Sequence, residues 1–324
     1  MREANYLDLT IAIPVYNEAA SLPILYEEIV ESCSKLDKSY EIIFIDDGSR
    51  DESFIVLKKI QNKDSKVKII RLRRNFGQTA ALAAGFDQAK GDVIITLDAD
   101  LQNDPKDFDI LIKKIDEGYD IVSGWRQKRK DNFLTRRLPS ITANRIISLI
   151  TGVKLHDYGC TLKAFRRNVI KNIKLYGELH RFIPAIASNM GVSVTEVKVN
   201  HRSRRFGKSK YGLIRFIKVI LDLMTVKFLL SYITRPLQIF GLFGLFSGLL
   251  GGILLLYLTY QRFIVKVAIA GRPLLMIAVL FLVIGIQFIT LGLLAEIMVR
   301  IYHESVEKRI YFISEIVESE SDTT

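Results

Sequence analysis

Two long stretches without a charged side chain constrain this chain more than any other feature of its sequence. They run from Pro236 to Gln261 and from Pro273 to Ala295. Each is longer than the ~20 residues that an α-helix needs to cross the hydrocarbon core of a bilayer. Two buried helices of a soluble core are the alternative, but soluble helices of this length usually carry charge on one face. We therefore predict two transmembrane helices, at about 236–261 and 273–297.

The position of these stretches also predicts the topology of the chain. The first 20 residues contain no apolar core of the signal-peptide type. We therefore expect the N-terminal part to stay in the cytoplasm and the two spans to return the C-terminus to the same side. The loop 262–272 complicates this expectation, because its three basic residues would lie on the outside.

Changes in composition divide the 324 residues into four parts. Residues 1–212 mix charged and apolar side chains in the proportion of an ordinary folded domain. Residues 213–235 are apolar with spaced charges, which predicts amphipathic juxtamembrane helices at the membrane surface. Residues 236–299 form the predicted hairpin. Residues 300–324 form a cytoplasmic tail that is acidic from Glu315, where we expect disorder.

The first part of the chain alternates short apolar runs with helical patterns. Strands are expected at Leu9–Val15, Glu41–Ile45, Val67–Leu72 and Val93–Leu97, and helices at Ser21–Leu36, Asp51–Gln61 and Thr79–Ala89. This alternation predicts an α/β fold with a Rossmann-like, mostly parallel sheet. Ligands of such sheets bind beyond the carboxyl ends of the strands.

A polar turn follows each of these four strands. The turns are Pro14–Glu18, Asp46–Ser49, Arg73–Gln78 and Asp98–Asp100. A single Asp-Asp-Gly-Ser turn is usually only a helix cap with a tight turn. Four polar turns at the ends of consecutive parallel strands would line one crevice, which turn chemistry alone does not explain. The pattern predicts a ligand site there.

Asp98 and Asp100 place two carboxylates at the end of an apolar strand. Such groups are costly to desolvate, so they need a cation, a hydrogen-bond network or open water. Two cysteines and four scattered histidines provide neither a disulfide framework nor a zinc motif. The net charge of +11 is concentrated in Arg126–Arg137 and His201–Lys218. These clusters are compatible with nucleic acid, but anionic headgroups or phosphates explain them more simply.

Four segments resemble glycosyltransferase family 2, the inverting nucleotide-sugar transferases with a GT-A fold. They are IPVYNEAASL, IDDGSRD, RRNFGQTAAL and LDADLQNDP. The segments VSGWRQKRKD, DYGCTLKAFRR and HRSRRFGKSKYG narrow the resemblance to the polyprenyl-phosphate branch, which includes dolichyl-phosphate mannose synthase and bacterial glucosyltransferases with two C-terminal spans. The resemblance extends from about residue 8 to residue 235. Processive synthases of the family carry a Gln-x-x-Arg-Trp motif, whereas the only tryptophan here is Trp125, which favours a single transfer.

The resemblance implies a metal-dependent, inverting transfer of a sugar to polyprenyl (undecaprenyl) phosphate at the inner membrane by a multi-pass protein. UDP-glucose is the expected donor. A GDP-mannose donor and transfer to a lipid hydroxyl are the alternatives, and a catalytically inactive membrane scaffold is disfavoured by the intact Asp98–Gln102 motif. The implied partners are the nucleotide sugar, the lipid phosphate and the bilayer, without nucleic acid. The glycine-rich face of the first span suggests a homo-oligomer.

The resemblance also assigns roles to individual residues. Mg²⁺ or Mn²⁺ would be held by Asp98, Asp100 and Gln102. Asp100, Asp157 and Arg204 form the expected catalytic set, in which Arg204 contacts the donor diphosphate and Asp157 is either a base or orients the sugar. The acceptor phosphate would contact Arg126, Lys130 or Arg137. The nucleotide sugar would contact Pro14, Tyr16, Asn17, Glu18, Asp46, Asp47, Arg73, Gly77, Gln78, Asp98, Ala99, Ser209 and Lys210.

Overall fold

The computed structural model describes residues 7–127, 144–145, 147–148, 151–173, 175, 179–188, 190–203, 236–269, 272–304 and 310–318. The chain divides into two compact units. One comprises Met1–Val226 together with Arg309–Thr324, and the other comprises Lys227–Lys308. The predicted juxtamembrane helices at 213–235 lie outside the described residues.

The first unit contains one eight-stranded sheet in the order β7-β5-β6-β4-β1-β2-β3-β8. Its strands are β1 Leu7–Val15, β2 Tyr40–Asp46, β3 Val67–Leu72, β4 Gly91–Thr96, β5 Ile121–Trp125, β6 Lys163–Arg166, β7 Val194–Lys198 and β8 Ile313–Val317. β1 is parallel to β2 and β4, and β2 to β3. β6 is antiparallel to both β4 and β5, whereas β5 and β7 are parallel. The predicted α/β fold with a mostly parallel sheet is therefore confirmed.

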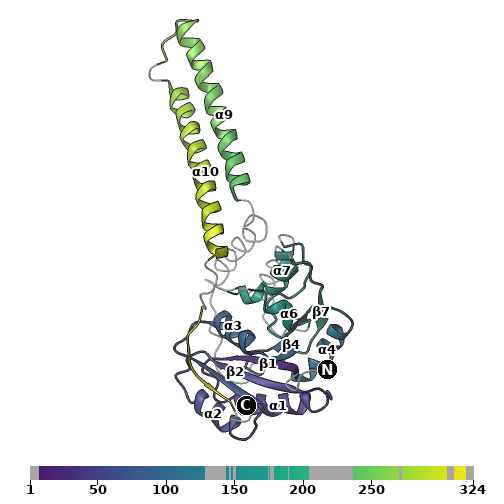
Figure 1. Cartoon of the computed structure of the whole chain (residues 1–324). Helices are drawn as coiled ribbons and strands as arrows, with labels where there is room; N and C mark the ends of the chain where they lie inside the picture. The colour runs from purple at the N-terminus through teal and green to yellow at the C-terminus, as the bar shows by residue number, and fades with distance from the viewer. Residues whose placement is uncertain are drawn as a thin grey trace. The chain divides into compact units, whose positions relative to one another are not determined.

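Helices cover both faces of this sheet (Figure 1). The helices are α1 Leu22–Cys33, α2 Ser53–Gln61, α3 Gln78–Gln88, α4 Phe108–Asp116, α6 Arg167–Ile170 and α7 Ile183–Ser188, with 3₁₀ turns η1 Pro105–Asp107 and η3 Leu179–Arg181. Along β1, Ile11 and Ile13 face the core under α1, α2 and α4, whereas Ala12 lies under α3. This alternation is the period-2 pattern of a sheet that is buried on both faces.

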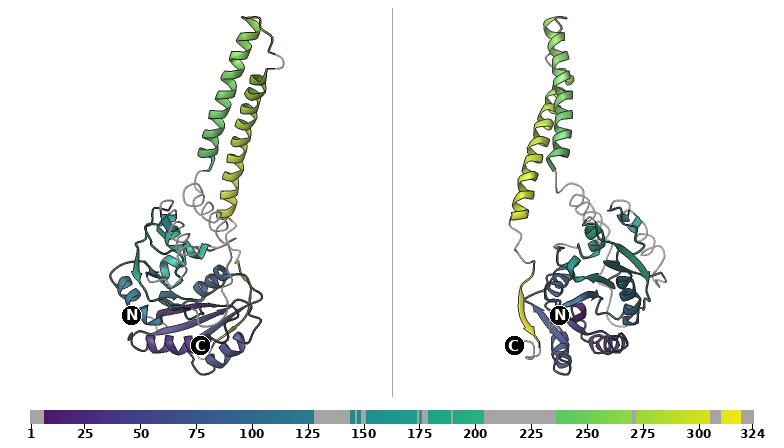
Figure 2. Two further views of the ribbon diagram at one scale, coloured as in Figure 1. Left: turned by 180° about the vertical axis from the view of Figure 1, so that it is seen from behind. Right: turned by 45° about the vertical axis from the view of Figure 1, so that its right-hand side comes forward.

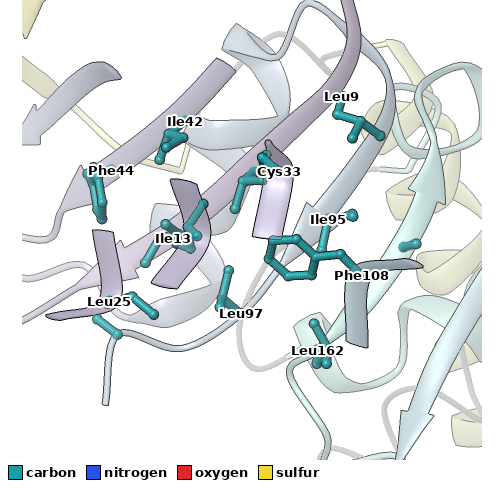
Figure 3. Close-up of a cluster of buried hydrophobic side chains, with 14 of the residues drawn as sticks. Leu9, Ile13, Leu25, Cys33, Ile42, Phe44, Ile95, Leu97, Phe108 and Leu162 are labelled. Atoms are coloured by element: carbon teal, nitrogen blue, oxygen red, sulfur yellow. The ribbon is translucent and has the colours of Figure 1, made fainter. Parts of the chain in front are cut away.

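The main core lies on the α1–α2–α4 face. Figure 3 shows Ile13, Phe44 and Ile95 of the sheet close to Leu25 of α1 and Phe108 of α4. These side chains are fully or almost fully buried. The core fixes the strands in register and so fixes the positions of the turns at their carboxyl ends.

The strand β8, Ile313–Val317, corrects the expectation of disorder at the first residues of the acidic tail, whereas residues 319–324 lie outside the described residues. Residues 313–317 pair antiparallel with β3 at the edge of the sheet, where β8 is the yellow strand of Figure 1. Ile313, Glu315 and Val317 are partly buried, and Tyr311 Oη, just before the strand, donates to Asp87 Oδ2 at 2.6 Å. The burial of β8 alternates along the strand, but its sequence does not, because the charged Glu315 lies on the partly buried side and Ile316 on the exposed side.

The second unit is a helical hairpin of α9 Pro236–Phe263 and α10 Pro273–Glu304, which lie side by side in both views of Figure 2. Phe240–Phe263 and Pro273–Met298 are long and apolar enough to cross a membrane, and only 22% and 11% of their most apolar windows is buried. Side chains such as Leu242, Phe246 and Met276 are exposed. A soluble core helix would bury such side chains, so the two helices have the exposure expected of lipid-facing spans.

Glycines bring α9 and α10 into close contact. A Cβ atom on Gly244 would lie 2.7 Å from the Gly285 carbonyl oxygen, and one on Gly251 would lie 2.8 Å from the Ala278 carbonyl oxygen. Ser247 Oγ also donates to the Phe281 carbonyl across the same interface at 2.8 Å. Part of the glycine-rich face that the sequence assigns to subunit association therefore packs within the chain, and association of subunits stays a prediction.

Candidate active site

Hydrogen bonds hold the turn after β1 against the turn after β2. Asn17 N donates to Ser49 Oγ at 3.0 Å, and Asn17 Oδ1 accepts from Arg50 N at 2.8 Å. Glu18 N donates to Ser53 Oγ at 2.9 Å. Asn17 has a φ of 55°, a left-handed conformation that Asn adopts more readily than most residues. Asn17 and Glu18, both predicted to contact the donor, are thus first of all parts of the turn that shapes the crevice.

Asp47 joins the turn after β2 to the turn after β3. Its Oδ1 accepts from Phe76 N at 2.7 Å and its Oδ2 from Gly77 N at 2.9 Å. Burial raises the pKa of the Asp47 carboxyl, while the two backbone hydrogen bonds act in the opposite direction. A Cβ on Gly48, at a φ of 65°, would lie 2.5 Å from the Arg74 backbone. Only glycine allows the two turns to approach this closely.

Asp46 is fully buried at the end of β2. Its Oδ1 accepts from Ser49 N at 2.9 Å, and its Oδ2 lies 3.5 Å from Arg71 Nε. Within the described part of the chain, Asp46 Oδ2 accepts no hydrogen bond. The ion pair with Arg71 is therefore the charge compensation that the structure gives this oxygen.

Four more of the residues predicted to contact the donor lie at or just after the carboxyl ends of β1, β3 and β4. Pro14 is partly buried at the end of β1, opposite Ile45, and Tyr16 follows it with a partly buried side chain. Ala99 is buried between the two carboxylates. Arg73 is exposed, and its backbone N–H donates to the Phe312 carbonyl at 2.9 Å.

Asp98 and Asp100 lie at the carboxyl end of β4, in the middle of the sheet. Gln78, the first residue of α3, donates from Nε2 to Asp98 Oδ1 at 2.7 Å. Asp100 is buried, and its Oδ1 accepts from Gln102 N at 3.2 Å. Leu101, which follows Asp100, has a φ of 62°. A left-handed leucine is unusual and marks a sharply turned backbone of the kind found at functional sites.

The electrostatics of this carboxylate pair fit a divalent cation. Burial and the negative charge of Asp100 raise the pKa of the Asp98 carboxyl to about 6. A bound cation would relieve that repulsion. Among the described residues, no group of three or more His, Cys, Asp or Glu side chains is arranged to hold a metal. Two carboxylates, the Gln102 amide and ligand phosphate oxygens are nevertheless a donor set that Mg²⁺ or Mn²⁺ accepts.

Arg126 and Asp157 form a bidentate ion pair. Arg126 Nε donates to Asp157 Oδ2 at 2.6 Å and Nη2 donates to Oδ1 at 2.9 Å, and the side chains are only 14% and 4% exposed. Burial alone lowers the pKa of Arg126, but the hydrogen bonds and charge of Asp157 outweigh this effect and raise it. A Cβ on Gly159 would lie 3.3 Å from Arg126 Nη2. The glycine leaves room for the pair.

Two buried polar groups beside the crevice escape prediction from the sequence. The Lys163 ammonium is buried on β6 and donates to the Cys160 and Tyr158 carbonyls, and burial lowers its pKa. His180 Nδ1 lies 2.7 Å from Thr79 Oγ1 in the first turn of α3. The charges of Arg126 and Lys163 both act on Asp98. A Leu-His-Arg segment in a short 3₁₀ turn carries no pattern that points to this position.

Arg202, near the start of the basic cluster His201–Lys218, is anchored beside the carboxylates. Arg202 N donates to the Gln102 carbonyl at 2.9 Å. Its guanidinium contacts Glu28 and Asp104, each at 2.7 Å. The ion pairs of Arg202 are therefore structural. The predicted residues Arg204, Ser209, Lys210, Lys130 and Arg137 lie outside the described residues.

Comparisons with known proteins agree with this architecture. The sequence model described as glycosyl transferase family 2 matches residues 10–174. A dodecaprenyl-phosphate galacturonate synthase of Rhizobium johnstonii is 42% identical over 319 residues, covering 97% of this chain and 94% of that protein. An undecaprenyl-phosphate 4-deoxy-4-formamido-L-arabinose transferase of Pseudomonas syringae pv. syringae is 40% identical over 315 residues, covering 97% and 92%.

Solved structures show the same fold at low sequence identity. Glucosyl-3-phosphoglycerate synthase from Mycobacterium tuberculosis, in complex with phosphoglyceric acid, matches with a TM-score of 0.52 at 17% identity and covers 69% of this chain and 80% of that chain. Its complex with Mn²⁺, uridine diphosphate and phosphoglyceric acid matches with the same TM-score and identity, covering 68% and 78%. The sheet-containing unit therefore has the GT-A type of fold.

Proposed function

The chain belongs to glycosyltransferase family 2, and we propose that it transfers one sugar from a nucleotide diphosphate sugar to polyprenyl phosphate. The observation that carries this proposal is similarity over 97% of the chain, the helical hairpin included, to proteins named for transfer to dodecaprenyl or undecaprenyl phosphate. An acceptor in the membrane also explains why a chain with a GT-A fold has two helices long enough to cross a membrane.

The proposed reaction is an in-line displacement at the anomeric carbon of the sugar. A phosphate oxygen of the acceptor forms the new bond to this carbon, while the bond to the nucleotide diphosphate breaks on the opposite face. An α-linked donor would give a β-linked product. The acceptor phosphate is already an anion, so the attack needs little help from a general base. Catalysis would come mainly from positioning and electrostatics.

The Arg126–Asp157 pair fits a positioning role in this reaction. Both Asp157 carboxylate oxygens accept hydrogen bonds from the Arg126 guanidinium, which disfavours both expected roles, general base and direct orientation of the sugar. We propose that Asp157 holds Arg126 so that its positive charge faces the reacting phosphate groups. Arg204, outside the described residues, remains our candidate for contact with the donor diphosphate.

Asp98, Asp100 and Gln102 would hold a divalent cation, either Mg²⁺ or Mn²⁺. When bound, the cation would neutralise charge on the departing diphosphate. Gln78 donates to Asp98 Oδ1 and would help to hold this carboxylate in place. The complex of a structural relative with Mn²⁺ and uridine diphosphate supports a divalent ion in this fold.

For the donor, we carry four sugars into the test. Glucose on UDP is the expectation from the sequence, and GDP-mannose is its alternative. Galacturonate is favoured by the name of the relative that is 42% identical. We further propose that the enzyme is a multi-pass protein of the inner membrane, with residues 1–212 as its catalytic domain on the cytoplasmic face.

One assay tests the function. Purified full-length protein is incubated with undecaprenyl phosphate, Mg²⁺ or Mn²⁺, and a panel of labelled UDP-glucose, GDP-mannose and the UDP derivatives of galacturonate and 4-deoxy-4-formamido-L-arabinose. We expect a labelled lipid with one donor. Undecaprenol, which has a hydroxyl in place of the phosphate, is the matched control and should stay unlabelled. Labelling of undecaprenol alone would instead support the lipid-hydroxyl alternative, and no labelled lipid with any donor would contradict the proposal.

A further inference from the structure

A chain of charged contacts connects the strand after the second apolar helix to the donor side of the crevice. Arg71 on β3 lies directly opposite Glu315 on β8. Arg71 Nη1 is 3.4 Å from Glu315 Oε1, while Arg71 Nε is 3.5 Å from Asp46 Oδ2. The guanidinium lies 4.0 Å above the Phe54 ring, and Lys58 Nζ is 3.6 Å from the other oxygen of Glu315.

The Arg71 guanidinium forms ion pairs with two carboxylates, and these two carboxylates differ in burial. Asp46 is fully buried, whereas Arg71 and Glu315 are 36% and 39% exposed. A buried carboxylate depends on its counter-charge far more than an exposed one does. Without Glu315, Arg71 would lose the contact that holds its outer nitrogen and could turn toward water.

The same C-terminal segment contacts the turn after β3. Phe312 accepts a hydrogen bond from Arg73 N at 2.9 Å, and the Phe312 and Phe76 ring centroids are 6.1 Å apart. The register of β3 and β8 shifts between Arg71 and Leu72, and such irregularities often re-aim side chains beside functional sites. Phe76 N is also one of the two amides that Asp47 holds.

We propose that Glu315 is a positioning residue of the nucleotide-sugar site. Glu315 holds Arg71 against Asp46. Through this contact β8, the strand after the second apolar helix, contributes to donor binding. Asp46 Oδ1 accepts a hydrogen bond from Ser49 N, and this bond shapes the turn after β2. A shift of Arg71 therefore changes the turn that would border the donor. This inference rests on the proposed function for its ligand, a nucleotide sugar, but not for its geometry.

The strand provides its own matched control. Glu318 also pairs across to β3, with Lys68 Nζ at 2.8 Å, but Lys68 lies near the opposite end of β3 from the crevice. Glu315→Gln and Glu318→Gln each remove one negative charge and one ion pair from the same segment. Only the first removes a contact that leads to Asp46.

The test uses the full-length protein and two measurements. In transfer assays, Glu315→Gln should raise the donor KM about two- to five-fold, the size typical of a partly exposed ion pair, with kcat nearly unchanged. Glu315→Asp should recover part of the loss, and Glu318→Gln should leave the KM unchanged. In hydrogen exchange without substrate, the Ser49, Phe76 and Gly77 amides should exchange faster in Glu315→Gln than in Glu318→Gln.

The two measurements separate failure of this inference from failure of the proposed function. If the wild type transfers sugar and both variants show the same donor KM, Glu315 has only a structural role and the inference is wrong. Equal exchange of the three amides in both variants would also overturn it. If no donor is used but exchange at these amides differs as expected, the proposed function fails while the positioning by Glu315 stands.

Discussion

At the scale of single residues, the two carboxylates at the end of β4 are the feature of the site that is most costly to bury. Burial and, after it, the negative charge of Asp100 raise the pKa of the Asp98 carboxyl. A protein gains no stability from such an arrangement unless something positive binds there. The cost is consistent with a site built for a cation and a diphosphate.

Neutralising either carboxylate should therefore abolish most of the transfer. We expect Asp98→Asn and Asp100→Asn to lower kcat/KM about 100-fold or more, the scale of losing a metal's electrostatic contribution. Asp109→Asn on α4, where the side chain is 48% exposed and pairs with Lys113, is the control and should be silent. Excess chelator should abolish wild-type transfer, and added Mg²⁺ or Mn²⁺ should restore it. Full activity in chelator would contradict the metal assignment.

The Arg126–Asp157 pair makes a prediction about stability. Removing one partner of a buried pair leaves the other charge uncompensated, so Arg126→Gln and Asp157→Asn should each destabilise the protein by ~3–5 kcal/mol. The double variant should lose clearly less than the sum of the two losses. Thermal unfolding of the full-length protein in detergent measures this. Additive losses would mean that the two side chains do not depend on each other.

The sequence could indicate some of these residues and not others, for a physical reason. Asp98 and Asp100 are predictable because they directly follow an apolar strand, and strand order brings such ends to one edge. The contact between Arg126 and Asp157 is not predictable from spacing, because they come from different segments 31 residues apart. The role of Asp47 in holding the Phe76 and Gly77 amides is also invisible until the two turns are placed side by side.

At the scale of elements, strands in the middle of the sheet were easier to predict than the edge strand β8. β3 has the predicted bounds Val67–Leu72, and β1, β2 and β4 differ from theirs by one or two residues, because continuous apolar runs mark strands that are buried on both faces. β8 contains Glu315 among only five residues and follows a membrane-length helix. Its pairing partner lies more than two hundred residues earlier, so no local pattern could identify it.

The hairpin makes a prediction about helix packing. A leucine at Gly244 would collide with the Gly285 carbonyl, since a Cβ there already lies 2.7 Å from that oxygen. We expect Gly244→Leu to separate α9 from α10 and to lower the midpoint of thermal unfolding in detergent by several degrees. Gly252→Leu is the matched control, because a Cβ at Gly252 meets no described atom within 4 Å. Equal midpoints for the two variants would show that this interface contributes little.

At the scale of the whole molecule, the sheet itself constrains the topology. β3 precedes the two apolar helices in the chain and β8 follows them, yet both strands belong to one sheet. Two ends of a chain that pair in one sheet must lie on the same side of a membrane. The segment between them therefore crosses an even number of times. Two crossings, by α9 and α10, satisfy this condition with the lengths observed.

The side on which the sheet lies can be predicted by weighing the basic residues near the helix ends. Arg262, Lys266 and Arg272 lie in the loop between the helices, against Arg235, Arg300, Lys308 and Arg309 at the other ends. The positive-inside rule thus slightly favours a cytoplasmic sheet.

Cysteine labelling tests this side. Val265, between the two helices, is 47% exposed and Lys59 on α2 is exposed, so both positions accept a reporter cysteine. The native Cys33 and Cys160 are buried. In intact cells, a membrane-impermeant maleimide should label Val265→Cys but not Lys59→Cys, and both should react after permeabilisation. Labelling of Lys59→Cys in intact cells would place the sheet outside. Labelling of both only after permeabilisation would mean that α9 and α10 do not cross the membrane.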